Sequence, residues 1–139
     1  DIQAALGYSQ LQRIDEFVRH RRYLANRYDQ MLKDLPVTLP WQDPETYSAY
    51  HLYVIRLHLN QLQKSRKQIF EELRAAGINV NVHYIPVHTQ PYYARMGFKA
   101  GDFPVAEAYY REAITLPLYY GLSDADQDYV VERLREIMR

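Results

Sequence analysis

The stretch that decides the fold reads Gly77-Ile78-Asn79-Val80-Asn81-Val82-His83-Tyr84-Ile85-Pro86-Val87-His88-Thr89-Gln90-Pro91-Tyr92-Tyr93. Apolar residues alternate with asparagine and histidine up to position 85, and this pattern predicts a strand over 78–85 with one apolar and one polar face. Two prolines then end the strand in a rigid loop that carries a histidine, an amide and two tyrosines. A strand that leads into such a loop is typical of a small-molecule site. A half-buried edge strand with a wet outer face explains the same pattern.

The residues before this stretch predict a helix and a central strand. Residues 62–76 have helical periodicity, and Gly77 is suited to end that helix in the left-handed conformation. Residues 48–58 are rich in aromatic and branched side chains on both faces, which favours a central strand. Because the strand at 78–85 follows the helix almost directly, we expect a tight β-α-β unit.

The outer parts of the chain add further helices. Residues 2–35 predict one long helix, which Pro36 and Pro40 end in an extended path. Pro104 fits the first turn of a short helix over 104–113, and Pro117 confines the extended segment 114–119 to a sheet edge. Ser123 predicts the cap of a last helix, whose apolar stripe includes Val130 and Leu134. The prediction is an α+β fold with about four helices and three strands.

Composition excludes several classes of protein. The 139 residues fit one domain, and the absence of cysteine excludes disulfides and thiolate metal sites. The 17 basic and 17 acidic side chains cancel, which argues against a nucleic-acid binder. No apolar run approaches the roughly 20 residues that cross a bilayer. We expect a cytoplasmic protein without a nucleic-acid or membrane partner.

The chain carries no self-sufficient catalytic constellation. Its five histidines lack the spacing of a zinc protease, so no metal site is predicted. Its serines lie outside any Gly-x-Ser-x-Gly elbow, and no glycine-rich phosphate loop occurs. The sequence by itself therefore predicts a binding surface rather than a reactive centre.

Four separated blocks resemble one enzyme family. They are Asp1–Gly7 with Gln10-Leu11 and Arg21-Arg22, the strand His51–Arg56, the stretch Gly77–Tyr93, and Leu116-Pro117-Leu118. Together they resemble the C-terminal part of the DegT/DnrJ/EryC1/StrS sugar-nucleotide aminotransferases. The run at 82–93 is most similar to the branch that makes UDP-4-amino-4,6-dideoxy-N-acetyl-β-L-altrosamine for pseudaminic acid.

The resemblance implies a fold, a cofactor and substrates. Such enzymes have the aspartate-aminotransferase-like fold (pyridoxal-phosphate fold type I), act as homodimers, and move an amino group from L-glutamate to a UDP-linked 4-keto-6-deoxy sugar. The cofactor, pyridoxal 5'-phosphate, is bound mainly by a large N-terminal domain that also supplies the Schiff-base lysine. Residues 1–139 would be the C-terminal small domain, without that lysine, without bound cofactor and inactive alone. The start at Asp1 within a helical pattern also leads us to expect a piece of a longer protein.

The resemblance also points to candidate substrate-binding residues. It implies that His83 and Tyr84 lie nearest the active site, with His88 and Gln90 behind them. His83 would hydrogen-bond the sugar or the donor amino acid; a structural histidine that ties the strand end to the loop is the alternative. Arg56 would clamp the glutamate carboxylate, or else form a local ion pair at the end of its strand.

A second class of function stays open at this point. A stand-alone α+β binding or scaffold module without catalysis would have the same pattern of elements. The reading frame upstream of Asp1 discriminates between the two: a preceding segment of about 200–250 residues with a lysine in a Ser-x-x-x-x-Lys-like setting decides for the enzyme, and a start codon at Asp1 decides against it.

Overall fold

The computed structural model describes residues 1–139, and its sheet is built around one central strand. Strand β2 (Tyr53–Leu57) pairs with β1 (Val37–Thr38) on one side and with β3 (Ala113–Leu116) on the other, both antiparallel. The prediction of a central strand near 48–58 is therefore confirmed, as is the edge position of the segment that follows residue 113. The class is α+β, with a small three-stranded antiparallel sheet.

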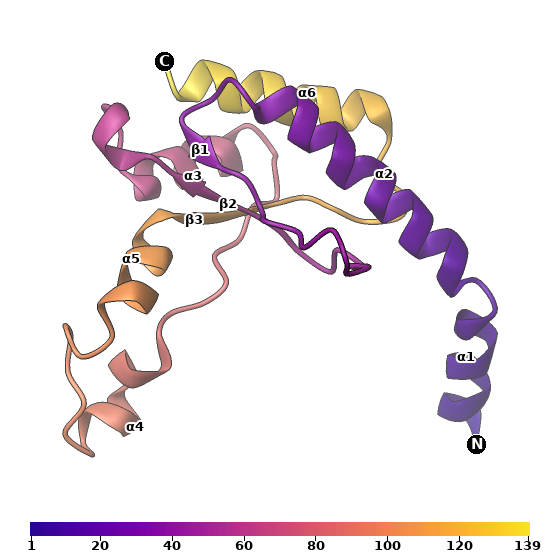
Figure 1. Cartoon of the computed structure of the whole chain (residues 1–139), viewed down its shortest axis with the longest axis horizontal. Coiled ribbons are helices and arrows are strands. Elements are labelled where there is room, and N and C mark those ends of the chain that lie inside the picture. Colours follow the sequence, from indigo (N-terminus) through magenta and orange to yellow (C-terminus); the bar gives the residue numbers. More distant parts are fainter.

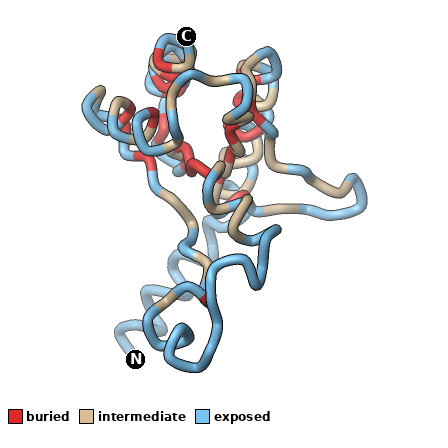
Figure 2. Tube along the Cα trace, turned by 90° about the vertical axis from the view of Figure 1, so that its left-hand side faces the viewer, coloured by how far each residue is buried: buried red, intermediate tan, exposed pale blue.

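Three helices cover one face of this sheet. They are α2 (Ile14–Leu32), α3 (Arg66–Ala75) and α6 (Asp124–Ile137), and α2 and α6 lie side by side above the strands in Figure 1. Tyr53, Ile55 and Leu57 point to this side and are almost fully buried. Leu24 from α2, Ile69 from α3 and Leu134 from α6 complete a continuous core. Figure 2 shows that the buried residues gather in this body.

Local capping sets the ends of these helices. Ser65 begins α3 with a capping box, since its side chain accepts from the Gln68 amide and the Gln68 side chain accepts from the Ser65 amide. Gly77 follows α3 with φ +79°, which confirms the predicted left-handed end. Ser123 accepts from the Asp126 amide and begins α6, as predicted. No helix is both long enough and apolar enough to cross a membrane.

The prediction of one helix over 2–35 is wrong. Helix α1 (Ile2–Leu11) ends before Arg13, and α2 starts at Ile14 in a new direction (Figure 1). Arg13 has φ −109° and ψ 3°, and its guanidinium lies over the rings of Phe17 and Tyr120, 4.8 and 5.7 Å from their centroids. Local helix propensity does not predict this break, because the contact that accompanies it joins Arg13 to Tyr120, which is distant in the sequence. Helix α1 has no buried residue and extends away from the body.

The prediction of a strand over 78–85, and of a β-α-β unit with it, is also wrong. Only Asn81 pairs with β3, through two backbone hydrogen bonds to Thr115 of 3.2 and 2.8 Å. The Asn81 side chain accepts from the amide of Val82 at 2.8 Å, a local bond that competes with a regular ladder. Val80 is buried, but Tyr84 is 70% exposed, so the alternation fails after the bridge.

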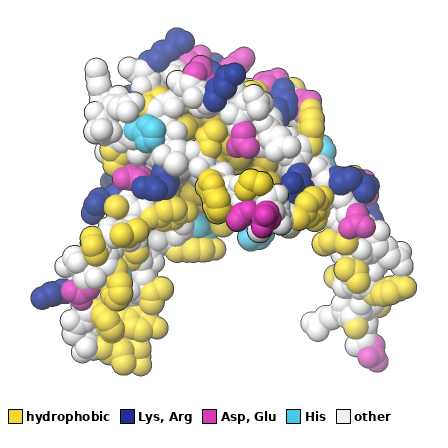
Figure 3. Space-filling view, in the orientation of Figure 1, with side chains coloured by type: hydrophobic (Ala, Val, Ile, Leu, Met, Phe, Trp, Pro, Cys, Tyr) yellow, Lys and Arg dark blue, Asp and Glu magenta, His cyan; other side chains and the backbone are white.

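The chain then leaves the body as a second extension, which we call the arm (residues 84–110). It contains the short helices η2 (Val87–Thr89) and α4 (Pro91–Ala94) and most of α5 (Pro104–Glu112), while η1 (Leu59–Gln61) belongs to the body. The arm and α1 descend on opposite sides of the body in Figure 1. Figure 3 shows hydrophobic side chains gathered on the arm. The face of the sheet opposite α2, α3 and α6 is covered only in part, by α5, which contacts β2.

Candidate functional site

The side of the sheet opposite α2, α3 and α6 carries the candidate site, and we call it the open face. Strand alternation directs Val54 and Arg56 away from the core. The register pairs Val54 with Thr115 and Arg56 with Ala113, so Thr115 shares this side. One apolar, one charged and one hydroxyl side chain thus lie together at the root of the arm.

His83 lies at the edge of the open face and is held through both ring nitrogens. Its Nδ1 is 2.8 Å from Thr115 Oγ1, and its Nε2 is 3.3 Å from Asn81 Nδ2. Because the Asn81 oxygen accepts from Val82, its amide nitrogen faces His83 and can only donate. In the neutral ring, Nδ1 therefore carries the proton and donates to Thr115. This arrangement leaves the Thr115 hydroxyl proton for another acceptor.

A polar cavity of about 430 Å³ adjoins His83. Arg74, Asn79, Asn81 and Thr115 supply most of its polar groups, and no carboxylate lines it. Arg74 hydrogen-bonds to Asn79 across this cavity. His83 therefore belongs to a donor-rich network with Thr115 and Asn81.

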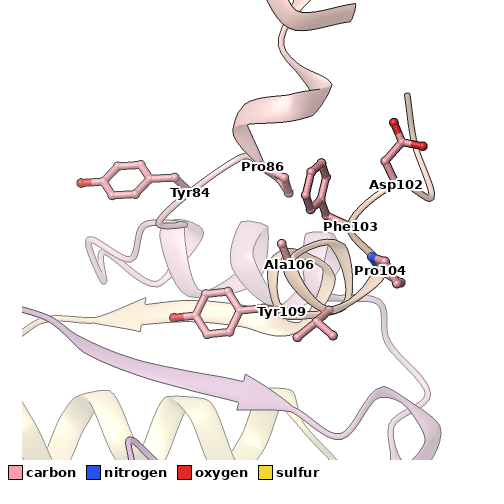
Figure 4. Close-up of a pocket in the computed structure, with 8 residues that line it drawn as sticks. Tyr84, Pro86, Asp102, Phe103, Pro104, Ala106 and Tyr109 are labelled. Carbon is pink, nitrogen blue, oxygen red and sulfur yellow. The ribbon is translucent and has the colours of Figure 1, made fainter. Parts of the chain in front are cut away.

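Tyr84 projects from the next position and lines a larger cavity of about 660 Å³. Pro86, Phe103 and Tyr109 contribute to the same cavity, and Figure 4 shows the hydroxyl groups of Tyr84 and Tyr109 pointing to the same side. The Tyr84 ring is 70% exposed and lies edge-on to the His83 ring, with 4.5 Å between centroids. Its hydroxyl is therefore available to a ligand on this side of the molecule.

Arg56 forms an ion pair with Glu112 at the end of α5. Its Nε and Nη2 atoms donate to the same oxygen, Glu112 Oε2, at 3.0 and 2.7 Å. The guanidinium also lies 5.9 Å from the centre of the Tyr109 ring. Since a carboxylate of the chain already engages Arg56, this geometry corresponds to the local ion pair rather than to a free clamp.

His88 and Gln90 lie in the arm, away from the open face. His88 is 8% exposed, and its Nε2 is 2.9 Å from Glu107 Oε1. The backbone amide of Gly101 donates to the same carboxylate, and these two bonds lower the pKa of Glu107, the Gly101 bond most. Gln90 precedes α4, and its carbonyl accepts from the Ala94 amide. His88 thus links η2 to α5 within the arm.

The structure thus brings His83 and Tyr84 together, whereas His88 and Gln90 lie in the arm. Tyr109 connects Tyr84 with Arg56, because it lines the Tyr84 cavity and another cavity that contains Arg56.

Three residues of the site, Tyr109, Glu112 and Thr115, were not predicted from the sequence. The one signal available was at Thr115, a polar residue between two apolar ones in the predicted extended segment 114–119.

The four lysines lie away from the cavities described above. Lys64 pairs with Glu72 at 2.7 Å and Lys67 with Glu71 at 3.7 Å. Lys33 and Lys99 are exposed, and no lysine lines the cavities of His83, Tyr84 or Arg56.

Known proteins match this chain over nearly all of its length. SpsC, a spore coat polysaccharide biosynthesis protein of Bacillus subtilis strain 168, is 37% identical over 142 residues that cover 100% of this chain and 36% of SpsC. Spr1654 of Streptococcus pneumoniae, described as a sugar aminotransferase, superposes with a TM-score of 0.91 at 34% identity, covering 99% of this chain and 35% of that one. Its solved forms include an apo form and forms with pyridoxamine and pyridoxal phosphate.

A third relative is PseC of Helicobacter pylori, an aminotransferase involved in the biosynthesis of pseudoaminic acid. It superposes with a TM-score of 0.89 at 30% identity, covering 99% of this chain and 37% of PseC. The chain therefore spans about a third of the length of the relatives that it matches. Residues 1–135 match the family as a whole, and the chain belongs to the DegT/DnrJ/EryC1/StrS aminotransferase family.

Proposed function

We propose that residues 1–139 form the C-terminal small domain of a pyridoxal-phosphate-dependent sugar-nucleotide aminotransferase. The observation that carries this proposal is the superposition of 99% of the chain on a sugar aminotransferase at a TM-score of 0.91. The remaining two thirds of such an enzyme would hold the cofactor and the Schiff-base lysine. This part alone would then be inactive and bind no cofactor.

The proposed reaction moves an amino group from L-glutamate to a UDP-linked 4-keto-6-deoxy sugar. The likeness to PseC supports a role in making pseudaminic acid or a related surface glycan. The full-length enzyme would act as a homodimer in the cytoplasm. The cofactor supplies the chemistry of amino transfer, while the protein supplies binding and orientation.

Within this scheme the open face orients the substrate. Thr115 offers a hydroxyl proton that His83 leaves unused, and Tyr84 offers a second hydroxyl from an exposed ring. Both are neutral donors, so they suit the hydroxyl and carbonyl oxygens of a sugar. His83 is then a positioning residue, which acts through Thr115 and Asn81.

The full-length protein tests the proposal directly. Addition of L-glutamate should convert its bound pyridoxal phosphate into the pyridoxamine form, and a UDP-4-keto-6-deoxy sugar should reverse that conversion. His83→Ala should raise the KM for the sugar several-fold and change the glutamate half-reaction little. His51→Ala is the matched control, because His51 is an exposed histidine outside the cavities. A protein that binds no pyridoxal phosphate, or that ignores both substrates, would refute the proposal.

The expected inactivity of the short chain has its own test. After incubation with pyridoxal phosphate and borohydride, we expect low, scattered labelling of the four lysines. Stoichiometric labelling of one lysine would show that a cofactor site is present within residues 1–139.

A further inference from the structure

A further cavity, the one that contains Arg56, combines aromatic, apolar and polar side chains as a carbohydrate site does. Its volume is about 340 Å³, and it lies between the loop after β1, the outward side of β2 and helix α5. Pro40, Trp41, Leu52, Val54, Arg56 and Tyr109 line it, and we call it the Trp41 slot. The volume is at the lower end of the range for small-molecule sites, about 300–1,000 Å³. This size suits a single ring rather than a large ligand.

Two aromatic side chains line the slot. Trp41 is the only tryptophan of the chain and is 83% exposed, although it is among the largest apolar side chains. Tyr109 is 36% exposed and contributes the other ring. An indole left almost wholly in water contributes little to the stability of the fold, so its position points to contact with something else. Leu52 and Val54 add an apolar floor.

The polar residues that line the slot are Thr38 and Arg56. Glu112 lies outside this lining and accepts from Arg56 Nε and Nη2, so Arg56 Nη1 keeps its protons. Because Glu112 balances the charge of Arg56, the slot favours a neutral ligand over a carboxylate or phosphate group. A hydroxyl on an apolar ring matches this arrangement.

We infer that the Trp41 slot binds the hexose ring of the sugar nucleotide, with an apolar face of the ring on the aromatic side chains and a hydroxyl on Arg56. This inference rests on the proposed function and adds Trp41, Tyr109 and Arg56, as specificity residues, to the groups that meet the sugar. The diphosphate and base lie outside the slot, because Glu112 neutralises Arg56, the one charged residue that lines it.

The single tryptophan supplies the test. We first confirm by circular dichroism that the 139-residue chain is helical, and then titrate it with UDP-N-acetylglucosamine while following Trp41 fluorescence. A saturable change is expected, with a dissociation constant on the order of 1 mM because one side of the slot is open to solvent. Tyr109→Leu should weaken binding at least about tenfold. Tyr8→Leu, which removes an exposed tyrosine of α1, should leave it unchanged.

A second variant keeps the inference testable if Tyr109→Leu disturbs α5. Trp41→Ala removes a side chain that is 83% exposed, so the fold should survive. Saturation-transfer NMR to the sugar protons should lose most of its signal in this variant.

Three outcomes would overturn the inference. They are an unchanged Trp41 emission in the folded chain, equal affinity for UDP alone, and full transfer to the sugar in Trp41→Ala. The proposed function fails separately: the full-length protein would then transfer no amino group, whatever the slot binds.

Discussion

Two buried tyrosines predict how the stability of this fold depends on alkaline pH. Tyr28 and Tyr53 are both fully buried, with ring centroids 4.9 Å apart. Tyr28 donates to the Pro117 carbonyl at 3.0 Å, and Tyr53 donates to Asp29 Oδ1 at 2.5 Å. Burial raises the pKa of both hydroxyls far above the usual value, and the hydrogen bond to Asp29 adds to the rise at Tyr53. Neither group ionises while the chain is folded at moderately alkaline pH.

The sign and size of the effect follow from this difference between the folded and unfolded states. In the unfolded chain each tyrosine ionises near pH 10, so the stabilisation is fully present below that pH and is lost as the pH rises toward the folded-state pKa values. Above pH 10 each tyrosine therefore lowers the free energy of unfolding by about 1.4 kcal/mol per pH unit, which amounts to about 3 kcal/mol for the pair at pH 11. That loss is a large part of the roughly 5–15 kcal/mol that stabilises a typical domain.

Urea unfolding followed by far-ultraviolet circular dichroism at pH 8 and pH 11 measures the loss. The double variant Tyr28→Phe/Tyr53→Phe should be less stable at pH 8, because it lacks two hydrogen bonds, yet lose less than about half as much free energy as the parent between the two pH values. Tyr50, whose pKa burial also raises, accounts for part of the remainder. An equal loss in the parent and the variant would refute the reasoning.

Three further predictions concern local structure, each measured as the free energy of unfolding in urea. Gly77→Ala should cost about 1 kcal/mol from backbone strain alone, since φ is +79° and an added Cβ meets no atom within 4 Å; a neutral result would mean that the left-handed end is absent. Ser65→Ala should cost about 1 kcal/mol by removing the cap of α3, while Ser9→Ala on exposed α1 should cost less than about 0.5 kcal/mol; equal effects would count against the cap. Gln127→Leu should cost about 1–2 kcal/mol, because the fully buried amide donates to the Leu24 carbonyl at 2.8 Å and accepts from Arg27; unchanged stability would show that this link between α2 and α6 is unimportant.

Sequence patterns predicted those parts of the fold that depend on neighbouring residues. Gly77 and Ser123 are confirmed as helix ends because capping involves only one turn of chain. The apolar strand at 53–57 is confirmed as central, since a run that is apolar on both faces needs partners on both sides. For the two helix ends the signal and the structure lie within a few residues of one another, whereas the strand indicates by its own composition that it has partners, without saying which.

The errors arose where distant contacts decide the outcome. The break at Arg13 coincides with its contact with Tyr120, more than a hundred positions away. The alternation at 78–85 failed as a strand because β3 offers a partner only at Thr115, and side-chain bonds of Asn81 replace the ladder. No local pattern contains either contact.

The candidate site shows the same division. His83, Tyr84 and Arg56 could be selected by residue type and resemblance, but Tyr109, from a separate helix, is the residue shared by the cavity of Tyr84 and the cavity of Arg56. The partner of Arg56, Glu112, comes from the end of that same helix. Trp41 could not be selected from the sequence, because its exposure is a property of the folded chain.

The central claim is that the open face of the sheet meets the sugar substrate, and hydrogen–deuterium exchange of the full-length protein tests it most directly. With a saturating UDP-linked 4-keto sugar, we predict slower exchange in peptides that cover 38–41, 54–56 and 83–84, and no change in α6 on the opposite side. Protection elsewhere in the protein, with these three segments unchanged, would contradict the claim.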